Sequence, residues 1–382
     1  MKVALIHDWL TGMRGGEKCL EVFCELFPDA DLYTLVYDPD SVSPAIRRMN
    51  VKASWINRLP GVRKHFRYFL PLFPQAIESF ELGDDYDLIL SSSHCVAKGI
   101  HPHRALHIAY VHTPMRYIWD MGDAYLAGGT SLLARAGLAL SRPYLRRWDL
   151  TSTRRVDQVI ANSNNVAAKI QRIYGRTATV IYPPVNFDKF HLADKLQPYY
   201  LIVSALVPYK RIDLAVDAFN AVKLPVKIAG DGPLRRFLQQ RAKSNVEFLG
   251  WVDDGKLVEL YSQCQAVIFP GEEDFGIVPL EAQASGRPVI AYARGGVTES
   301  VIALEDRDGA KPTGLFFSEA TPASLIESLR RYQAVKHLFD PAALRRHAAQ
   351  FSRVVFKTQM EQFINAKLLE RARSGQQDAE TA

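Results

Sequence analysis

Short apolar runs alternate with amphipathic segments through the first half of the chain. Apolar residues recur at helical spacing in residues 18–27 and 166–174. The apolar runs have the length and the aliphatic content of buried strands; they are residues 3–6, 32–36, 88–91, 108–111, 159–161 and 180–182. Strands and helices that alternate in this way predict a mainly parallel sheet with helices on both faces.

A second alternation of the same kind follows Pro183-Pro184 and a polar run at 186–197. Its predicted strands are 200–203, 226–228, 246–249, 266–269 and 288–291, and its predicted helices are 213–221, 233–242, 256–263 and 278–285. The pattern predicts an α/β protein with two doubly wound, Rossmann-like domains. Open sheets of this kind bind ligands at the carboxyl ends of their strands, so we expect the site in a cleft between the domains.

The domain boundaries follow from these patterns. We predict an N-terminal domain at 1–184, a linker at 185–197, a C-terminal domain at 198–340, helices at 341–373 and a disordered tail at 374–382. The helices at 341–373 are expected to pack back on the N-terminal domain.

The composition fits a globular protein with two cores, because the chain has 382 residues, of which 48% are apolar and 23% charged. No apolar stretch reaches about 18 residues, and the start enters a strand pattern directly, so neither a membrane span nor a signal peptide is predicted. The cysteines show no metal-ligand spacing; they are Cys19, Cys24, Cys95 and Cys264. We expect a cytoplasmic protein with reduced thiols. The net charge of +6 favours anionic partners.

The most informative string runs from Pro270 to Glu299. It places Glu273 and Glu281 on either side of a Phe-Gly turn. A spacing of eight along one helix would separate the two side chains by roughly 80° at about 100° per residue, so we assign Glu273 to the loop after a strand and Glu281 to the following helix. The amides of Gly276, Ile277 and Val278 open that helix and form an anion site. Two carboxylates beside a phosphate cradle suit a nucleotide-sugar.

This string resembles the Glu-x7-Glu donor-binding motif of the retaining glycosyltransferases of family 4, which have the GT-B fold. The match includes Phe275-Gly276, Ala282, Gly286 and Pro288-Val289-Ile290. The resemblance implies that Glu273 accepts hydrogen bonds from donor sugar hydroxyls and that Glu281 holds the ribose. It covers nearly the whole chain and makes the N-terminal domain the acceptor side.

The loop after residue 203 departs from the family at one position. Lys210 matches the lysine of the family pattern Gly-Arg-Leu-x-x-x-Lys, but Ala205 stands where the family has an arginine. A leaving diphosphate needs positive charge as the glycosidic bond breaks. Arg211, Arg14 or Arg294 is expected to supply it; otherwise the protein is catalytically impaired.

Other strings support the same resemblance. Gly15-Gly16 is similar to the Gly-Gly-x-Glu loop that reaches the donor phosphates, and the segment ending at Val252 is similar to the one that holds the nucleotide base. The string at 110–120 resembles the His-Thr-Pro-Met-Arg-Tyr segment of a bacterial subgroup, many of whose members are mannosyltransferases of surface-polysaccharide synthesis. The resemblance implies that His112 lies beside the transferred sugar. The turn residues expected to touch the acceptor are Ser92, Ser93, His94 and Lys98.

The segment from Arg58 to Phe73 mixes cations with aromatic residues. This composition is typical of an interfacial membrane segment. A helix packed by its aromatic face is the alternative. We expect no nucleic-acid partner, because no motif of a nucleic-acid module is present.

The resemblance therefore implies a retaining hexosyltransferase, with GDP-mannose as the first donor and a UDP-sugar as the alternative. The expected acceptor is a saccharide, carried on a lipid at the inner face of the cytoplasmic membrane. The motifs imply no metal ion and no cofactor. A nucleotide-sugar-binding protein without turnover and a sugar-nucleotide epimerase stay open. An NAD-dependent oxidoreductase is disfavoured, because the Gly-x-Gly-x-x-Gly fingerprint is missing after the first strand.

Overall fold

The computed structural model describes residues 1–119, 132–305, 309 and 311–380. The described chain divides into two compact units. The first unit contains residues up to 184 and returns at 354, and the second unit contains residues 185–353. Asp120, at the end of the string at 110–120, and the last two residues of the predicted tail lie outside the described residues.

The first unit is built on a parallel sheet of seven described strands in the order β3-β2-β1-β4-β5-β6-β7. The strands are β1 (Val3–His7), β2 (Asp31–Thr34), β3 (Asn50–Ala53), β4 (Leu88–Ser93), β5 (Leu106–Val111), β6 (Gln158–Ala161) and β7 (Thr179–Val180). The chain starts in the middle of the sheet, adds β2 and β3 on one side and then adds β4 to β7 on the other. The order therefore reverses between β1 and β4.

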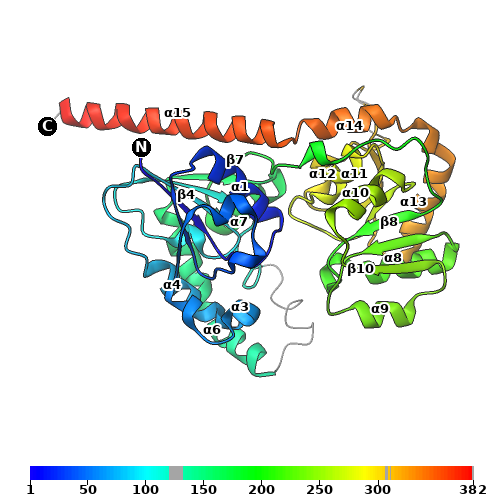
Figure 1. Cartoon of the computed structure of the whole chain (residues 1–382), viewed down its shortest axis with the longest axis horizontal. Helices are drawn as coiled ribbons and strands as arrows, with labels where there is room; N and C mark the ends of the chain where they lie inside the picture. Colours follow the sequence, from blue (N-terminus) through cyan, green and yellow to red (C-terminus); the bar gives the residue numbers. More distant parts are fainter. Residues whose placement is uncertain (120–131, 306–308, 310, 381–382) are drawn as a thin grey trace. The chain divides into compact units, whose positions relative to one another are not determined.

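Helices cover both faces of this sheet (Figure 1). They are α1 (Gly15–Leu26), α2 (Pro44–Arg47), α3 (Val62–His65), α4 (Phe73–Glu78), α6 (Leu132–Ser152), α7 (Asn164–Tyr174) and α15 (Arg353–Glu380), with short helical turns η1 (Pro39–Ser41), η2 (Trp55–Arg58), η3 (Phe66–Leu72), η4 (Ala97–Gly99) and η5 (Thr153–Arg155). Alternate residues of β1 enter different cores: Ile6 packs with Phe73 and Trp148, whereas Leu5 packs with Phe23 of α1.

The second unit has a parallel sheet of six described strands in the order β10-β9-β8-β11-β12-β13. They are β8 (Tyr200–Val203), β9 (Val226–Ala229), β10 (Val246–Gly250), β11 (Val267–Phe269), β12 (Val289–Tyr292) and β13 (Gly314–Phe317). The helices are α8 (Ile212–Val222), α9 (Arg235–Arg241), α10 (Asp254–Gln263), α11 (Val278–Ala284), α12 (Val297–Ser300), α13 (Pro322–Val335) and α14 (Pro341–Ala349), with turns η6 (Phe187–Lys189), η7 (Pro208–Lys210) and η8 (Lys336–Leu338). Here the order reverses between β8 and β11.

The structure confirms the predicted fold class, two doubly wound α/β sheets. The predicted helix at 166–174 is α7, and Ser163 caps it by accepting a hydrogen bond from Val166 N at 3.0 Å. The predictions overlooked β3 and β13. Edge strand β3 escapes the pattern because its residues are only half-buried or exposed, which leaves no apolar run.

The C-terminal prediction needs two corrections. α14 packs against α11 within the second unit, so the segment from 341 does not as a whole return to the N-terminal domain. Only α15 does so, by burying Phe356, Met360 and Ile364 in the core that contains Phe23. The tail expected to be disordered from 374 continues as helix to Glu380.

The predicted linker at 185–197 is not a separate segment, because it belongs to the second unit.

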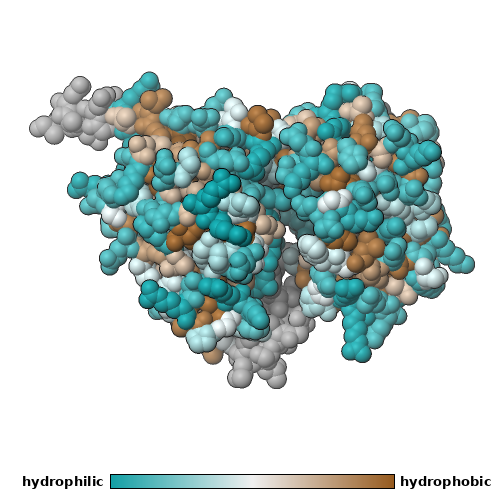
Figure 2. Space-filling view, in the orientation of Figure 1, coloured by the Kyte–Doolittle hydropathy of each residue, from teal (hydrophilic) through white to brown (hydrophobic). Residues whose placement is uncertain are grey.

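Most of the surface in Figure 2 is hydrophilic, with scattered hydrophobic groups. Within the described ranges, no helix is both long enough and apolar enough to cross a membrane. All four cysteines are buried free thiols.

Candidate functional site

In the second unit, Lys210 and Glu273 meet where the strand order reverses. Lys210 ends η7 after β8, and Glu273 lies on the loop after β11. The Lys210 ammonium forms an ion pair with Glu273 Oε1, and the two side chains are 15% and 22% exposed. Connections on the two sides of a reversal run in opposite directions and leave an opening at the carboxyl ends of the strands. The pair therefore lies where a doubly wound sheet binds its ligand.

Glycines allow the loops around this pair to approach closely. A Cβ on Gly271 would lie 2.8 Å from Lys210 Cα, and one on Gly295 would lie 2.3 Å from Glu273 O. Gly296 N also donates to Glu273 O at 2.9 Å. The loops after β8, β11 and β12 thus touch at Glu273, and side chains at these glycines would force them apart.

Glu281 lies on α11, as its spacing from Glu273 predicts. It is 7% exposed, and Tyr261 donates a hydrogen bond to Glu281 Oε2 at 2.8 Å. Burial and the neighbouring Glu281 raise the pKa of Tyr261 well above its usual value, so the phenol keeps the proton that it donates. Gly276 precedes α11 with a φ of 87°, a conformation that favours glycine, and Ile277 is the N-cap. Val278 is the first residue of α11, so the predicted amides do open this helix.

The other residues that the sequence predicts at the donor site lie on connections that follow strands of the second sheet. Arg211 interacts with Asp213 at 3.3 Å and donates to Ala320 O at 3.5 Å. Val252 follows β10 and is half-buried. Ala205 is exposed just after β8, and Arg294 is exposed on the loop after β12.

In the first unit, a buried carboxylate fixes the loop after β4. The Asp8 oxygens accept hydrogen bonds from the consecutive amides of residues 94–97 at 2.6–3.0 Å. His94 Nδ1 also lies 3.1 Å from Asp8 Oδ2. Burial raises the pKa of Asp8, but His94, His7 and these amides outweigh burial and lower it below the usual value. Asp8 is therefore ionised at neutral pH, and its charge holds this loop in place.

His112 follows β5 and joins two more residues at the same sheet edge. Its Nε2 lies 2.9 Å from Ser92 Oγ, which also lies 3.1 Å from His7 Nδ1. A Cβ on Gly16 would lie 3.5 Å from His7 Cε1 and 3.6 Å from His112 Nε2, so the Gly15-Gly16 loop rests on both rings. The predicted Gly15, Gly16 and His112 are thus brought together. Burial lowers the pKa of His112 to about 3, with His94 and His7 adding to the effect, so the ring is neutral at physiological pH.

Arg14 and Glu17 complete this edge from the start of α1. Arg14 N donates to Glu17 Oε2 at 3.0 Å, and the Arg14 guanidinium lies 4.0 Å from Glu17 Oε1. Arg14 is 56% exposed at its side chain, whereas Glu17 is 3% exposed. The sequence patterns overlooked Glu17 and Asp8 as parts of the site. The sequence does contain a signal for both residues. Each is a carboxylate at the end of a buried strand or at the start of the next helix, where a side chain is expected to be buried.

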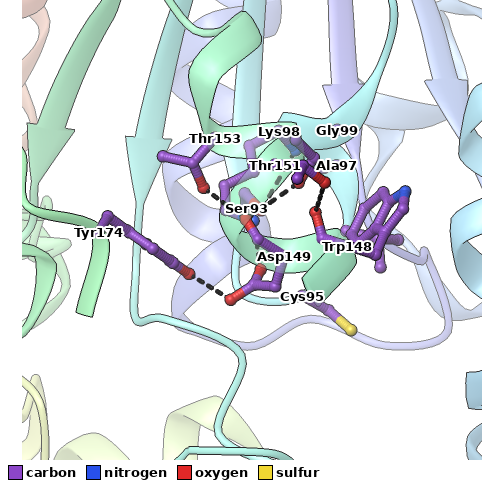
Figure 3. A network of polar contacts seen from close by, with 12 residues as sticks. Ser93, Cys95, Ala97, Lys98, Gly99, Trp148, Asp149, Thr151, Thr153 and Tyr174 are labelled. Carbon is purple, nitrogen blue, oxygen red and sulfur yellow. Dashed lines mark hydrogen bonds and ion pairs between the residues drawn. The ribbon is translucent and has the colours of Figure 1, made fainter. Parts of the chain in front are cut away.

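Asp149 on α6 forms a second buried anchor (Figure 3). Its carboxylate pairs with the Lys98 ammonium and accepts hydrogen bonds from Trp119 Nε1 at 2.7 Å and from the Tyr174 hydroxyl at 2.8 Å. Lys98 is 2% exposed and Asp149 is fully buried. Lys98 therefore anchors η4. The prediction from the sequence that it contacts an acceptor is wrong, because its side chain is buried against Asp149. Trp119 extends the anchor to the loop that carries His112.

The segment from Arg58 to Phe73 packs by its aromatic face, which was the alternative to an interfacial membrane segment. Phe66, Leu70 and Phe73 are buried in the core, as expected of a helix packed by its aromatic face. Its cations remain exposed: Arg58, Arg63, Lys64 and Arg67.

Two family models match the chain. The model described as Glycosyltransferase Family 4 matches residues 15–189, and the model described as Glycosyl transferases group 1 matches residues 186–338. The two matches correspond closely to the two units, and the second contains both Lys210 and Glu273.

Curated relatives include a rhamnosyltransferase and a mannosyltransferase. D-rhamnosyltransferase WbpZ of Pseudomonas aeruginosa is 32% identical over 51% of this chain and 54% of its own length. O-antigen chain mannosyltransferase C of Escherichia coli is 34% identical over 36% of this chain and 42% of its own length. The matches thus span about half of each relative.

A solved structure shares the fold over nearly the whole chain. Anabaena HepE, crystallised in complex with UDP, superposes with a TM-score of 0.67 at 17% identity and covers 96% of this chain and 100% of its own.

The Asp149 anchor predicts a large cost for removing its cation. Lys98→Met should lower the free energy of unfolding of the first unit by about 3–5 kcal/mol, because it leaves a buried carboxylate without its charge partner. Denaturant unfolding measures the change. Lys52→Met is the matched control, because Lys52 pairs with Asp31 at 3.0 Å but its side chain is 43% exposed; it should cost less than about 1 kcal/mol. Equal costs for the two variants would contradict the anchor.

Proposed function

Because the chain belongs to the glycosyltransferases of family 4, we propose that it moves a hexose from a nucleotide-sugar to a saccharide hydroxyl with retention at the anomeric carbon. The observation that carries this proposal is the Lys210–Glu273 ion pair at the strand-order reversal of the second unit. A cation and a carboxylate placed side by side suit a ligand that has a phosphate next to a ring bearing hydroxyl groups.

The proposed roles follow from the side chains that each element presents. Lys210 neutralises the leaving diphosphate, and Glu273 accepts hydrogen bonds from donor sugar hydroxyls. Glu281 holds the ribose from α11, where its carboxylate is buried and accepts a hydrogen bond from Tyr261. The amides of Gly276, Ile277 and Val278 take part in phosphate binding, and the backbone near Val252 binds the base.

The positive charge missing at Ala205 has a candidate source within the second unit. Arg211 is engaged by Asp213 and by Ala320 O, which directs its guanidinium to the start of α8. Arg294 is exposed and lies beside Gly295, whose backbone pairs with that of Glu273. We therefore favour Arg294 as the second cation for the diphosphate. With cations and amides meeting the phosphate charge, the proposed reaction needs no metal ion and no cofactor.

In the first unit, we assign His112 and the Gly15-Gly16 loop to the binding of sugar and phosphate groups. His112 is neutral, so it contacts the sugar by hydrogen bonding and not by charge. Arg14 is exposed beside Gly15 and suits an anionic group. The leaving diphosphate helps to deprotonate the acceptor hydroxyl on the same face, so no carboxylate base is assigned.

The donor proposed first is GDP-mannose, and the product is a surface polysaccharide. The Escherichia coli mannosyltransferase among the relatives supports this choice. A UDP-sugar is the second candidate, because Anabaena HepE was crystallised with UDP. A nucleotide-sugar-binding protein without turnover is a third candidate, favoured by Ala205.

We also propose that the first unit docks on an anionic membrane carrying a lipid-linked acceptor, at the inner face of the cytoplasmic membrane. We name the surface the basic–aromatic patch; its residues are Arg58, Arg63, Lys64, Arg67, Tyr68, Leu140, Tyr144 and Arg147. All of these residues are exposed, Tyr68 by 58% and Leu140 by 83%. η3 packs against α6, which joins the two halves of the patch within one unit. Exposed cations beside exposed apolar side chains suit anionic headgroups above acyl chains.

Glu273→Gln tests the donor site. The variant should stay folded and lose about 100- to 1000-fold in turnover, because an uncharged amide interacts more weakly with Lys210 and with the charge that develops on the sugar. Release of nucleoside diphosphate from the donor measures the rate. Glu272→Gln is the control, since Glu272 is the exposed neighbour, and it should remain within about twofold. Wild-type turnover in Glu273→Gln would remove Glu273 from the site.

The triple variant Arg63→Gln, Lys64→Gln, Arg67→Gln tests the basic–aromatic patch. It should lose about 100-fold in affinity for phosphatidylglycerol vesicles at low salt, because each cation near the surface contributes about 1 kcal/mol. Vesicle co-sedimentation gives the affinity. The control neutralises three exposed cations of the second unit, Arg236, Lys243 and Arg330. If both triple variants bind equally well, or if the wild type does not bind, the docking proposal fails.

A further inference from the structure

Four side chains of the first unit form a continuous polar chain. Glu17, His7, Ser92 and His112 follow one another, with Glu17 Oε1 4.0 Å from His7 Nε2, His7 Nδ1 3.1 Å from Ser92 Oγ, and Ser92 Oγ 2.9 Å from His112 Nε2. His7 and Ser92 are fully buried, and Glu17 is 3% exposed. The chain therefore runs from a buried carboxylate on α1 to a half-buried imidazole at the end of β5.

Ser92 couples the proton positions of the two histidines. Its hydroxyl has a single hydrogen, so when it donates to one of the two ring nitrogens it accepts from the other. In one arrangement, Ser92 donates to His7 Nδ1 and accepts from His112 Nε2. In the other, His7 donates to Ser92, and Ser92 donates to His112. The tautomer of His112 thus depends on that of His7.

Glu17 selects between these arrangements. His7 Nε2 is buried, has no hydrogen-bond partner among the described residues and faces the Glu17 carboxylate. Burial raises the pKa of Glu17, but His7 and His94 outweigh burial and hold it below the usual value, so Glu17 is ionised at neutral pH. At 4.0 Å the contact is longer than a hydrogen bond and acts through charge. A carboxylate attracts an N–H group and repels a nitrogen lone pair, so His7 carries its proton on Nε2.

Nearby charges do not compete for this nitrogen. Asp8 directs its two oxygens to the amides of residues 94–97 and to His94. The Arg14 guanidinium lies 4.0 Å from the same oxygen, Glu17 Oε1, and is itself a donor, so it does not act on the bare lone pair of His7. His94 lies 5.8 Å from His7 between ring centroids. Glu17 is therefore the group that faces His7 Nε2.

We infer that Glu17, acting through His7 and Ser92, places the proton of His112 on Nε2 and leaves Nδ1 as a hydrogen-bond acceptor for a hydroxyl group of the saccharide ligand. Glu17, His7 and Ser92 are positioning residues, and His112 is the residue that contacts the ligand. Among the described residues, no hydrogen bond reaches His112 Nδ1. The hydroxyl ligand rests on the proposed function, whereas the proton positions belong to the ligand-free protein.

Glu17→Gln should move the protons of His7 and His112 to the opposite ring nitrogens. Arg14 N donates to the oxygen at the Oε2 position and needs an acceptor there, so the amide oxygen of glutamine takes that position. Glutamine also serves at this position of a capping box, so the start of α1 is preserved. The amide NH₂ group then faces His7 Nε2 as a donor. His7 moves its proton to Nδ1, Ser92 turns to donate to His112 Nε2, and His112 carries its proton on Nδ1.

Nitrogen NMR of the full chain with ¹⁵N-labelled histidine measures these positions, because protonated and bare ring nitrogens have well-separated shifts. At neutral pH without ligand, wild-type His7 and His112 should both be protonated at Nε2. His112 should switch to Nδ1 in Glu17→Gln and return to the wild-type state in Glu17→Asp, which keeps the charge. A His112→Gln variant assigns the signals.

Two serine variants complete the test. In a Ser92→Ala background, Glu17→Gln should no longer change the His112 signals, because the link is missing. Ser91→Ala is the matched control: Ser91 contacts His107 at 2.9 Å, a bond that does not involve His112, so the His112 signals should not change.

The proposal is overturned if wild-type His7 or His112 carries its proton on Nδ1, or if folded Glu17→Gln leaves His112 unchanged. The wild-type spectrum alone can show a proton on Nδ1, so the proposal can be disproved even if the variant does not fold. Loss of the proposed function would appear separately, as absence of donor turnover with the tautomers as inferred.

Discussion

The site of each unit depends on one topological constraint, the reversal of strand order in a parallel sheet. β1 and β8 start their sheets in the middle, and the chain then adds strands on both sides. Neighbouring connections therefore diverge at β1/β4 and at β8/β11, and backbone polar groups and side chains gather at the opening that results. Lys210 and Glu273 lie at one reversal, and His7 and Ser92 lie at the other. The reversals of strand order therefore determine where the candidate site residues lie.

Loops at such an opening need fixed positions, and the first unit obtains them from buried carboxylates. Asp8 binds consecutive amides of the loop after β4, and Asp149 binds Lys98 on the next turn of the same segment. A buried charge is tolerated only when its partners are complete, so each carboxylate allows one arrangement of its loop. Glu17 differs, because one of its oxygens faces an imidazole across 4.0 Å. It acts on the position of a proton and not on the path of the backbone.

The sequence predicted what periodicity and short motifs encode. The two sheets, the helix at Glu281 and the loop position of Glu273 follow from apolar runs and from the spacing of the two glutamates. The sequence could not reveal contacts between distant segments: the Asp8 carboxylate meets amides more than eighty positions away, and Lys98 meets Asp149 across fifty-one. Lys98 looked like a ligand contact for this reason. Edge strand β3 and the division of the C-terminal helices between the units also depend on tertiary packing, which local pattern does not record.

Whether this chain binds a nucleotide-sugar can be measured with a thermal-shift panel. A ligand that binds only the folded state adds about 2.7 kcal/mol to the free energy of unfolding at 100 times its Kd, and this raises the melting temperature. The panel contains GDP-mannose, UDP-glucose and NAD, each with wild-type protein and with Glu273→Gln. We expect a shift with GDP-mannose that is smaller in Glu273→Gln, and a UDP-glucose shift in its place would change only the identity of the donor. No shift with either nucleotide-sugar, or a shift with NAD alone, would show that Glu273 and Lys210 do not form a nucleotide-sugar site.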